Sequence, residues 1–253
     1  MKPATLRFSG HVENYIKYRP GYPQGVLETL SQEWGLTGAS IIADMGSGTG
    51  ILSEVFLKNG NRVFGVEPNH EMREAAERLL RHYRNFTSVK GTAEASTLAD
   101  RAVDFVTAGQ AFHWFDRNQA RKEFSRILKP NGWVVLIWNE RLTDTSPFLR
   151  GYEELLQKYG TDYAAVDHRQ VDSDIIKAFF APRPFTLRQF ENRQVCDFDG
   201  AKGRLLSSSY TPEPGDPHYE PMLEALRTIF EKFQSDGRVT FDYATQMYCG
   251  QLT

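Results

Sequence analysis

The chain has few cysteines, no long apolar run and almost no net charge. Only Cys196 and Cys249 occur among its 253 residues, so their number excludes a disulfide framework and a thiolate zinc site. No apolar stretch approaches the roughly 20 residues that span a bilayer, so no membrane partner is expected. The formal net charge of −2 provides no basic field for nucleic acid, and no nucleic-acid partner is expected either.

Metal-binding and export signals are also lacking. The six histidines show no metal-ligand spacing, so no metal site is expected. Residues 1–8 have no apolar core of the kind that a signal peptide needs, which predicts a cytoplasmic location. The composition, 40% hydrophobic and 25% charged, is typical of a globular protein with a large core. We expect one domain over residues 1–253, as a monomer or homodimer.

The most informative stretch is residues 41–50, which read IIADMGSGTG. Its apolar start predicts a buried strand, and residues 51–57 continue with helical spacing of apolar side chains. Strand, glycine turn and helix together form the first half of a nucleotide-binding βαβ unit. The candidate ligand-binding residues of the turn are Asp44, Gly46, Ser47, Gly48, Thr49 and Gly50.

The spacing of the glycines helps to select the ligand. The dinucleotide fingerprint is G-x-G-x-x-G, whereas this turn reads G-x-G-x-G and has Ile51 where the third fingerprint glycine would fall. Asp44 would repel a pyrophosphate, but it suits a cationic ligand such as S-adenosylmethionine (SAM), which carries a sulfonium and an ammonium group. An NAD-type oxidoreductase remains an alternative at this point.

A second acid follows at the distance that a nucleotide site requires. The segment 62–67 predicts a strand that ends in Glu67, 21 residues after Gly46, where an acid can bind the ribose hydroxyls. Strands alternate with helices along the chain, which predicts a doubly wound parallel sheet with its ligand at the carboxyl ends of the strands. Further strands are expected over 86–90, 103–109, 133–139, 185–198 and 238–251. Helices are expected over 24–34, 68–80, 117–128, 146–159, 172–180, 201–209 and 219–233.

These motifs resemble those of the class I SAM-dependent methyltransferases, of the methyltransferase type 11 kind, closely over residues 35–140. The segment 91–94 and the turn 128–132 match further motifs of that family. The resemblance implies a Rossmann-like, seven-stranded, mostly parallel sheet whose last strand is antiparallel. It also implies an N-terminal cover (1–34), a SAM-binding core (35–140), and last strands with helical insertions that roof the site (141–253).

The resemblance also implies roles for individual residues. Glu94 would accept a hydrogen bond from the adenine amino group, and Met72 would either pack on the adenine or belong to the core. The further residues expected to bind SAM are Tyr15, Arg19, Glu67, Pro68, Thr92, Ala93, Gly109, Gln110 and Ala111.

The segments 15–23 and 110–116 together resemble the group of the trans-aconitate methyltransferases. This implies a small-molecule acceptor, often a carboxylic acid methylated on oxygen. A carboxylate needs no general base, whereas a hydroxyl or ring carbon of a quinone-like or natural-product acceptor needs one, and His113 is the candidate. Trp114 and Tyr210 are the candidate acceptor-binding residues, and a SAM-binding module without activity is a further alternative.

Basic side chains of the predicted roof could clamp an acceptor carboxylate, although the sequence does not select among them. They are Arg141, Arg150, His168, Arg169, Arg183 and Arg204.

Overall fold

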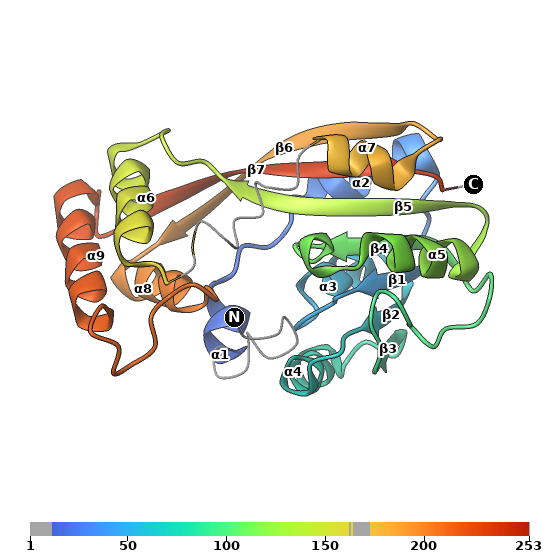
Figure 1. The fold of residues 1–253 in the computed structure, drawn as a ribbon, viewed down its shortest axis with the longest axis horizontal. Helices are drawn as coiled ribbons and strands as arrows, with labels where there is room; N and C mark the ends of the chain where they lie inside the picture. Colours follow the sequence, from blue (N-terminus) through green and yellow to red (C-terminus); the bar gives the residue numbers. More distant parts are fainter. Residues whose placement is uncertain (1–11, 162, 164–172, 253) are drawn as a thin grey trace.

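The computed structural model describes residues 12–161, 163 and 173–252. They form a seven-stranded sheet in the order β3-β2-β1-β4-β5-β7-β6 (Figure 1). The strands are β1 (Ile41–Met45), β2 (Arg62–Val66), β3 (Phe86–Val89), β4 (Val103–Gly109), β5 (Leu128–Arg141), β6 (Phe185–Cys196) and β7 (Val239–Gly250). Only β7 runs antiparallel to its neighbours. The predicted fold is therefore confirmed, including the reversed last strand.

The helices occupy both faces of the sheet and one end of it. They are α1 (Val12–Tyr18), α2 (Gln24–Trp34), α3 (Ile51–Lys58), α4 (His70–Leu80), α5 (Arg117–Ile127), α6 (Pro147–Tyr159), α7 (Ser173–Phe180), α8 (Phe198–Leu206) and α9 (Tyr219–Phe233), with a 3-10 turn, η2 (Phe112–Trp114). Side chains of α2 and α3 pack in one hydrophobic cluster with the sheet, and side chains of α5 and α7 pack in another. The sheet is thus covered on both faces, as its mostly parallel strands require.

A third hydrophobic cluster lies outside this sandwich. It joins α6, α8 and α9, which we call the helical lobe, to the ends of β6 and β7 around the buried side chains of Tyr152 and Phe241. Figure 1 shows the lobe at the left, away from β1 to β4, with the long strands β5, β6 and β7 running across to it. The helical lobe therefore has its own core and is joined to the rest of the chain by the three longest strands.

The structure corrects several predicted bounds. Strand β5 begins at Leu128 and passes through the predicted turn, with Asn131 at a φ of 64° inside it. Helix α8 begins after Asp197, whose side chain accepts a hydrogen bond from the Gly200 amide, so this helix lies three residues earlier than predicted at both ends.

Helix α1 connects the two parts of the molecule. It packs on α8 of the helical lobe and contacts α4, which packs beside β3 (Figure 1). None of its residues is fully buried, and its only described ion pair, Arg78–Glu13, is exposed to solvent. The N-terminal cover (1–34) remains a prediction, and its residues 1–11 lie outside the described range.

Candidate active site

The carboxyl ends of β1, β2 and β4 open onto one continuous cleft. Two adjoining pockets share the lining residues Tyr15, Gly46, Gly48, Gly109, Gln110 and Trp114. One pocket extends towards Glu67, Met72 and Glu94, and the other towards Asp44 and the helical lobe. The site lies where the order of the strands reverses, between β1 and β4, as expected for a doubly wound sheet.

The glycine turn holds its shape through backbone bonds and positive φ angles. The amides of Gly46 and Ser47 donate to the Val66 carbonyl, at 2.9 and 3.2 Å. A Cβ on Gly46 would lie 2.8 Å from the Cβ of Ala111, so only glycine fits there. A Cβ on Gly48, at a φ of 56°, would meet no atom within 4 Å. Gly48 therefore leaves open space next to the main chain, which suits a ligand lying on the turn.

Glu67 joins the glycine turn to the end of β2. One carboxylate oxygen accepts a hydrogen bond from the Gly48 amide at 2.9 Å, and the other accepts one from the Asn69 amide at 2.8 Å. Burial raises the pKa of Glu67, and these bonds oppose that rise. The carboxylate is thus fixed at the cleft wall with lone pairs available for further hydroxyl donors.

Asp44 is fully buried at the end of β1. Its carboxylate accepts hydrogen bonds from Ser53 Oγ at 2.6 Å and Thr107 Oγ1 at 3.2 Å. Burial raises its pKa to about 7, since desolvation outweighs the two hydroxyl bonds. A cationic ligand group in the cleft would favour the ionised form of this carboxyl.

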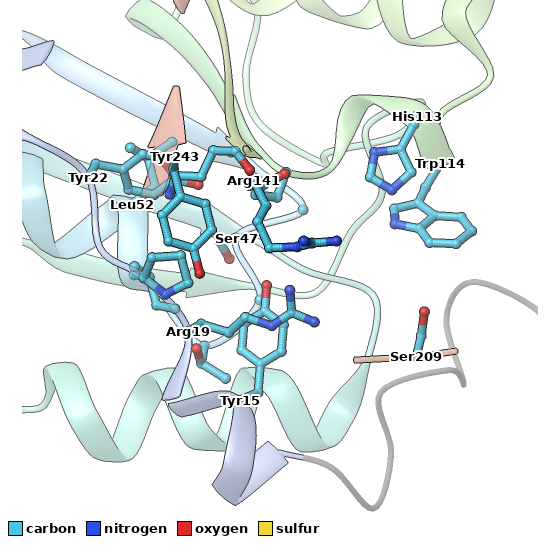
Figure 2. A pocket seen from close by; sticks show the side chains of 18 of the residues that line it. Tyr15, Arg19, Tyr22, Ser47, Leu52, His113, Trp114, Arg141, Ser209 and Tyr243 are labelled. Carbon is cyan, nitrogen blue, oxygen red and sulfur yellow. Dashed lines mark hydrogen bonds between the residues drawn. The ribbon is translucent and has the colours of Figure 1, made fainter. Parts of the chain in front are cut away.

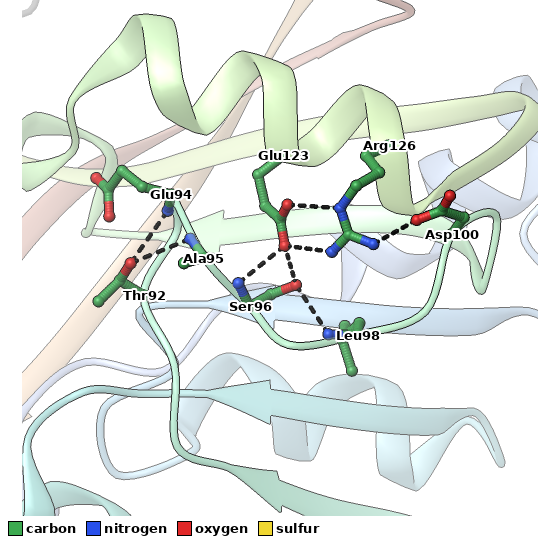
Figure 3. Close-up of polar contacts among 8 residues, drawn as sticks. All are labelled: Thr92, Glu94, Ala95, Ser96, Leu98, Asp100, Glu123 and Arg126. Atoms are coloured by element: carbon green, nitrogen blue, oxygen red, sulfur yellow. Dashed lines mark hydrogen bonds and ion pairs between the residues drawn. The ribbon is translucent and has the colours of Figure 1, made fainter.

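A polar network holds the loop that carries Glu94 (Figure 3). Glu123 of α5 accepts hydrogen bonds from the amide and the hydroxyl of Ser96, at 2.8 and 2.5 Å. Arg126 binds both oxygens of Glu123 and also pairs with Asp100. The loop is thereby fixed to α5, which positions Glu94 and its neighbours in the cleft wall.

The segment after β4 forms the opposite wall. Gln110 adopts a φ of 56°, and its side-chain amide donates to the Asn139 carbonyl at 3.1 Å. The rings of His113 and Trp114 lie 4.7 Å apart at the cleft, where Figure 2 shows them side by side. These two predicted residues therefore border the same cavity as the glycine turn.

Three arginines reach the cleft, one just after α1, one from β5 and one from α8. Arg19 donates to the Ser207 carbonyl at 2.7 Å and stacks on the Tyr15 ring. Arg141 pairs with Glu153 at 2.5 Å, and both Arg19 and Arg141 line the cavity drawn in Figure 2. Arg204 is 5% exposed and donates to the Tyr243 hydroxyl at 3.1 Å. The cleft therefore carries arginines at its lobe end and acids at Asp44 and Glu67.

All but one of the predicted site residues line this cleft. The exception, Gly50, faces the protein interior: a Cβ there would lie 2.6 Å from the Leu80 side chain. Of the candidate roof cations, Arg141 and Arg204 reach the cleft, Arg150 and Arg183 are exposed on the surface, and His168 and Arg169 lie outside the described residues. The roles of all these residues remain predictions.

Several lining residues were not predicted from the sequence. They include Leu52, Asn69, Asn139, Tyr163 and Tyr243. Tyr243 belongs to the alternating pattern of β7, which predicts its face but not what that face contacts. Asn139 is at the end of the fifth predicted strand, which was the one available signal.

The described residues offer neither a membrane-spanning helix nor a cluster of metal ligands. None of the described helices combines the length and the apolar character that crossing a bilayer requires. Within the same residues, no group of three or more His, Cys, Asp or Glu side chains is placed to hold a metal ion.

Sequence comparisons identify relatives of this chain. A family model for a methyltransferase domain matches residues 43–136. An uncharacterised methyltransferase-like protein of Schizosaccharomyces pombe is 34% identical over 61% of this chain and 59% of its own length. An uncharacterised methyltransferase of Mycobacterium tuberculosis is 35% identical over 54% of each chain. The chain thus spans a little over half of the length of these curated relatives.

Solved structures share the fold over almost the whole chain. A protein assigned as a type II methyltransferase from Anaeromyxobacter dehalogenans has a TM-score of 0.67 at 21% identity, covering 93% of this chain and 98% of its own. A methyltransferase assigned to antibiotic biosynthesis in Anabaena variabilis has a TM-score of 0.62 at 20% identity, covering 88% and 96%. The chain therefore shares the fold of these structures, and its residues 43–136 are similar to a methyltransferase domain.

Proposed function

We propose that the protein transfers a methyl group from SAM to a small-molecule acceptor in the cytoplasm. The observation that carries this proposal is the single cleft along the carboxyl ends of β1, β2 and β4. Acids stand at one side of this cleft and arginines at the other. SAM itself combines two cationic groups, a carboxylate and a ribose, so its charges and hydroxyls match such a surface.

The residues present fit SAM on specific observations. Glu67 is fixed by two backbone amides at the site expected for the ribose hydroxyls. Asp44 is a buried acid suited to the ammonium group, and Arg19, whose buried Nε has no hydrogen-bond partner, is suited to the carboxylate. The open space at Gly48 allows the ligand to approach the main chain. Met72 and Glu94 border the half of the cleft that would take the adenine.

Bound SAM supplies an electrophilic methyl group on a sulfonium that leaves as a neutral thioether. The residues of the chain align the acceptor with the methyl carbon and the sulfur, and they exclude water. A lone pair of the acceptor forms the new bond while the carbon–sulfur bond breaks and sulfur keeps its electron pair. Trp114 and Tyr210 shape the acceptor end of the cleft in this assignment.

A carboxylate oxygen of an organic acid is the acceptor atom that we favour. Such an oxygen is already a nucleophile at neutral pH, and the lobe end of the cleft carries arginines suited to acids. A hydroxyl or an activated ring carbon is the alternative. In that case His113, which borders the cleft, would take the proton released at the acceptor.

Calorimetric titration with SAM, S-adenosylhomocysteine (SAH) and NAD tests the binding step. We expect SAM and SAH to bind and NAD not to bind. Binding of NAD alone would contradict the proposal and favour an oxidoreductase. Binding of SAH without methyl transfer to any of a broad panel of acids, phenols and amines would favour a binding module without activity.

A further inference from the structure

The lobe end of the cleft contains a buried cation with only neutral partners. Arg204 of α8 is 5% exposed, and its described hydrogen bonds go to the Tyr243 hydroxyl at 3.1 Å and to Ser208 Oγ at 3.2 Å. In the part of the chain that the structure describes, no carboxylate lies within ion-pair distance of Arg204. A buried guanidinium without a counter-charge is costly, so the site is suited to an anion that arrives with a ligand.

Arg141 extends this site from the neighbouring strand. One of its terminal nitrogens, Nη2, binds Glu153 at 2.5 Å and the Tyr163 hydroxyl at 3.1 Å. Its other terminal nitrogen, Nη1, is buried and has no hydrogen-bond partner. Because Arg141 and Tyr243 are paired across β5 and β7, and Tyr243 binds Arg204, the two arginines are held on one wall.

Among the three arginines of the cleft, Arg204 is the one to which neither the described residues nor SAM, in the proposed function, supplies a negatively charged partner. Glu153 neutralises Arg141, and in the proposed function Arg19 pairs with the carboxylate of SAM. The positive charges also act on the phenol of Tyr210. Burial alone would raise its pKa, but the charges of Arg204 and Arg19 lower that pKa below its ordinary value. One positive charge therefore remains for the acceptor to match.

We propose that Arg204, together with Nη1 of Arg141, binds an anionic group of the acceptor that is not the atom being methylated. The inference rests on the proposed function. The chemical class is a carboxylate or a phosphate, since both accept the paired hydrogen bonds of a guanidinium. An oxygen held by guanidinium donors has its lone pairs engaged and is a poorer nucleophile. The reacting atom lies instead towards the wall formed by His113 and Trp114, on the other side of Arg141 from Tyr243 in Figure 2.

Calorimetry of the full chain saturated with SAH tests this site directly. The titrants are succinate, inorganic phosphate and, as an uncharged control, dimethyl succinate. We expect at least one anion to bind and the ester not to bind, and the anion that binds identifies the class. Binding of the ester as tightly as the acid, or of neither anion, would overturn the proposal.

Substitutions then assign the binding to Arg204. In Arg204→Gln we expect anion affinity to fall about 10-fold or more, because a charge-assisted bond is lost, while Arg204→Lys retains part of it. Arg150→Gln, which removes an exposed arginine of α6 in the same lobe, should bind anions like the wild type. Unchanged anion affinity in a folded Arg204→Gln protein would contradict the assignment. The wild-type comparison of acid and ester remains decisive if that variant does not fold.

SAH affinity separates this proposal from the proposed function. We expect Arg204→Gln to bind SAH within about 2-fold of the wild type, since Arg19 is the partner assigned to SAM. Failure of the wild type to bind SAH would contradict the proposed function itself, whereas SAH binding without anion binding would contradict only this inference.

Methyl-transfer assays extend the test to catalysis. Acceptors are offered in pairs that differ by one carboxylate or phosphate group away from the reacting atom. In any pair that is turned over, we expect the more anionic member to be preferred and Arg204→Gln to lose that preference through KM rather than kcat. Equal use of both members by the wild type would overturn the proposal. If no pair is turned over, the calorimetric comparison of succinate, phosphate and dimethyl succinate alone decides whether the proposal holds.

Discussion

The carboxyl of Asp44 is fully buried, and burial raises its pKa from an ordinary value near 3.8 to about 7. Because the pKa of Asp44 is higher in the folded state than in the unfolded state, this carboxyl favours folding of the unligated protein most at low pH. That contribution to stability is lost as the pH rises through 7. We predict that its free energy of unfolding falls between pH 5 and pH 8, by about 3 kcal/mol at most. Asp44→Asn should remove this slope in urea titrations at the two pH values.

The same carboxyl should make ligand binding depend on pH in the opposite direction. If the ammonium of SAH needs the ionised form of Asp44, SAH binds about 10-fold more tightly at pH 8 than at pH 6 and releases a proton near pH 6. Calorimetry in buffers of different ionisation enthalpy measures that proton. Glu67 also has a raised pKa, so Asp44→Asn is the control. An unchanged pH dependence in this variant would assign the effect elsewhere.

Gly48 and Gly60 form a matched pair for testing the glycine turn. Both have positive φ angles, 56° and 93°, and a Cβ on either would meet no protein atom within 4 Å. Alanine at either position should therefore cost a similar amount of stability, about 1 kcal/mol. We predict that only Gly48→Ala also weakens SAH binding, by at least about 10-fold, because the methyl group occupies ligand space. Equal SAH affinities in calorimetry would argue against the assigned position of the ligand.

At the scale of elements, the hydrogen bonds between α5 and the loop 92–98 allow a test of how that loop is positioned. The carboxylate of Glu123 is at their centre and accepts hydrogen bonds from Ser96 and Arg126. We predict that Glu123→Gln loosens the loop, speeds hydrogen exchange there and weakens SAH binding about 3- to 10-fold.

A surface ion pair supplies the control for this substitution. Lys58→Gln removes the pair with Glu54 on α3, which is largely exposed, and should leave SAH binding unchanged. If the two substitutions have equal effects on SAH affinity, the loop is not positioned through Glu123.

The elements also show what the sequence could predict. The apolar runs of β1, β2 and β4 follow from local patterning, because a parallel strand is buried along its whole length. The acids at the ends of β1 and β2, Asp44 and Glu67, follow from the same patterning. The extent of β5 did not follow, since the Pro130–Gly132 segment reads as a turn and its pairing depends on β4 and β7. The arrangement of Arg141, Arg204 and Tyr243 arises only from packing between segments far apart in the chain, which no local signal encodes.

At the scale of the whole molecule, α1 is held between the two halves by a close contact. Tyr18 packs so tightly on α8 that a Cβ on Gly203 would lie 2.0 Å from its ring. Gly203→Ala should therefore displace α1, although alanine is otherwise favoured in a helix. Since Tyr15 and Arg19 border the cleft, we predict about a 10-fold loss of SAH affinity and faster hydrogen exchange in α1.

Lys202→Ala changes the adjacent position of α8 and is the matched control. It should leave both the exchange of α1 and the affinity for SAH close to wild type. Tight SAH binding by Gly203→Ala, together with unprotected α1 amides, would show that α1 is not needed to cover the cofactor.

The pairing of β5 with β7 is continuous from Val134–Gly250 to Arg141–Tyr243. The wall that carries Arg141 and Tyr243 is thus the far end of a ladder that begins at Val134, in the hydrophobic core of the sheet. Engineering of acceptor choice is accordingly best aimed at side chains on this wall, such as Tyr243, whose exchange leaves the backbone ladder intact. Replacing the whole helical lobe would instead have to preserve the register of β5 and β7. A change in that register would disturb the proposed cofactor site as well as the proposed acceptor site.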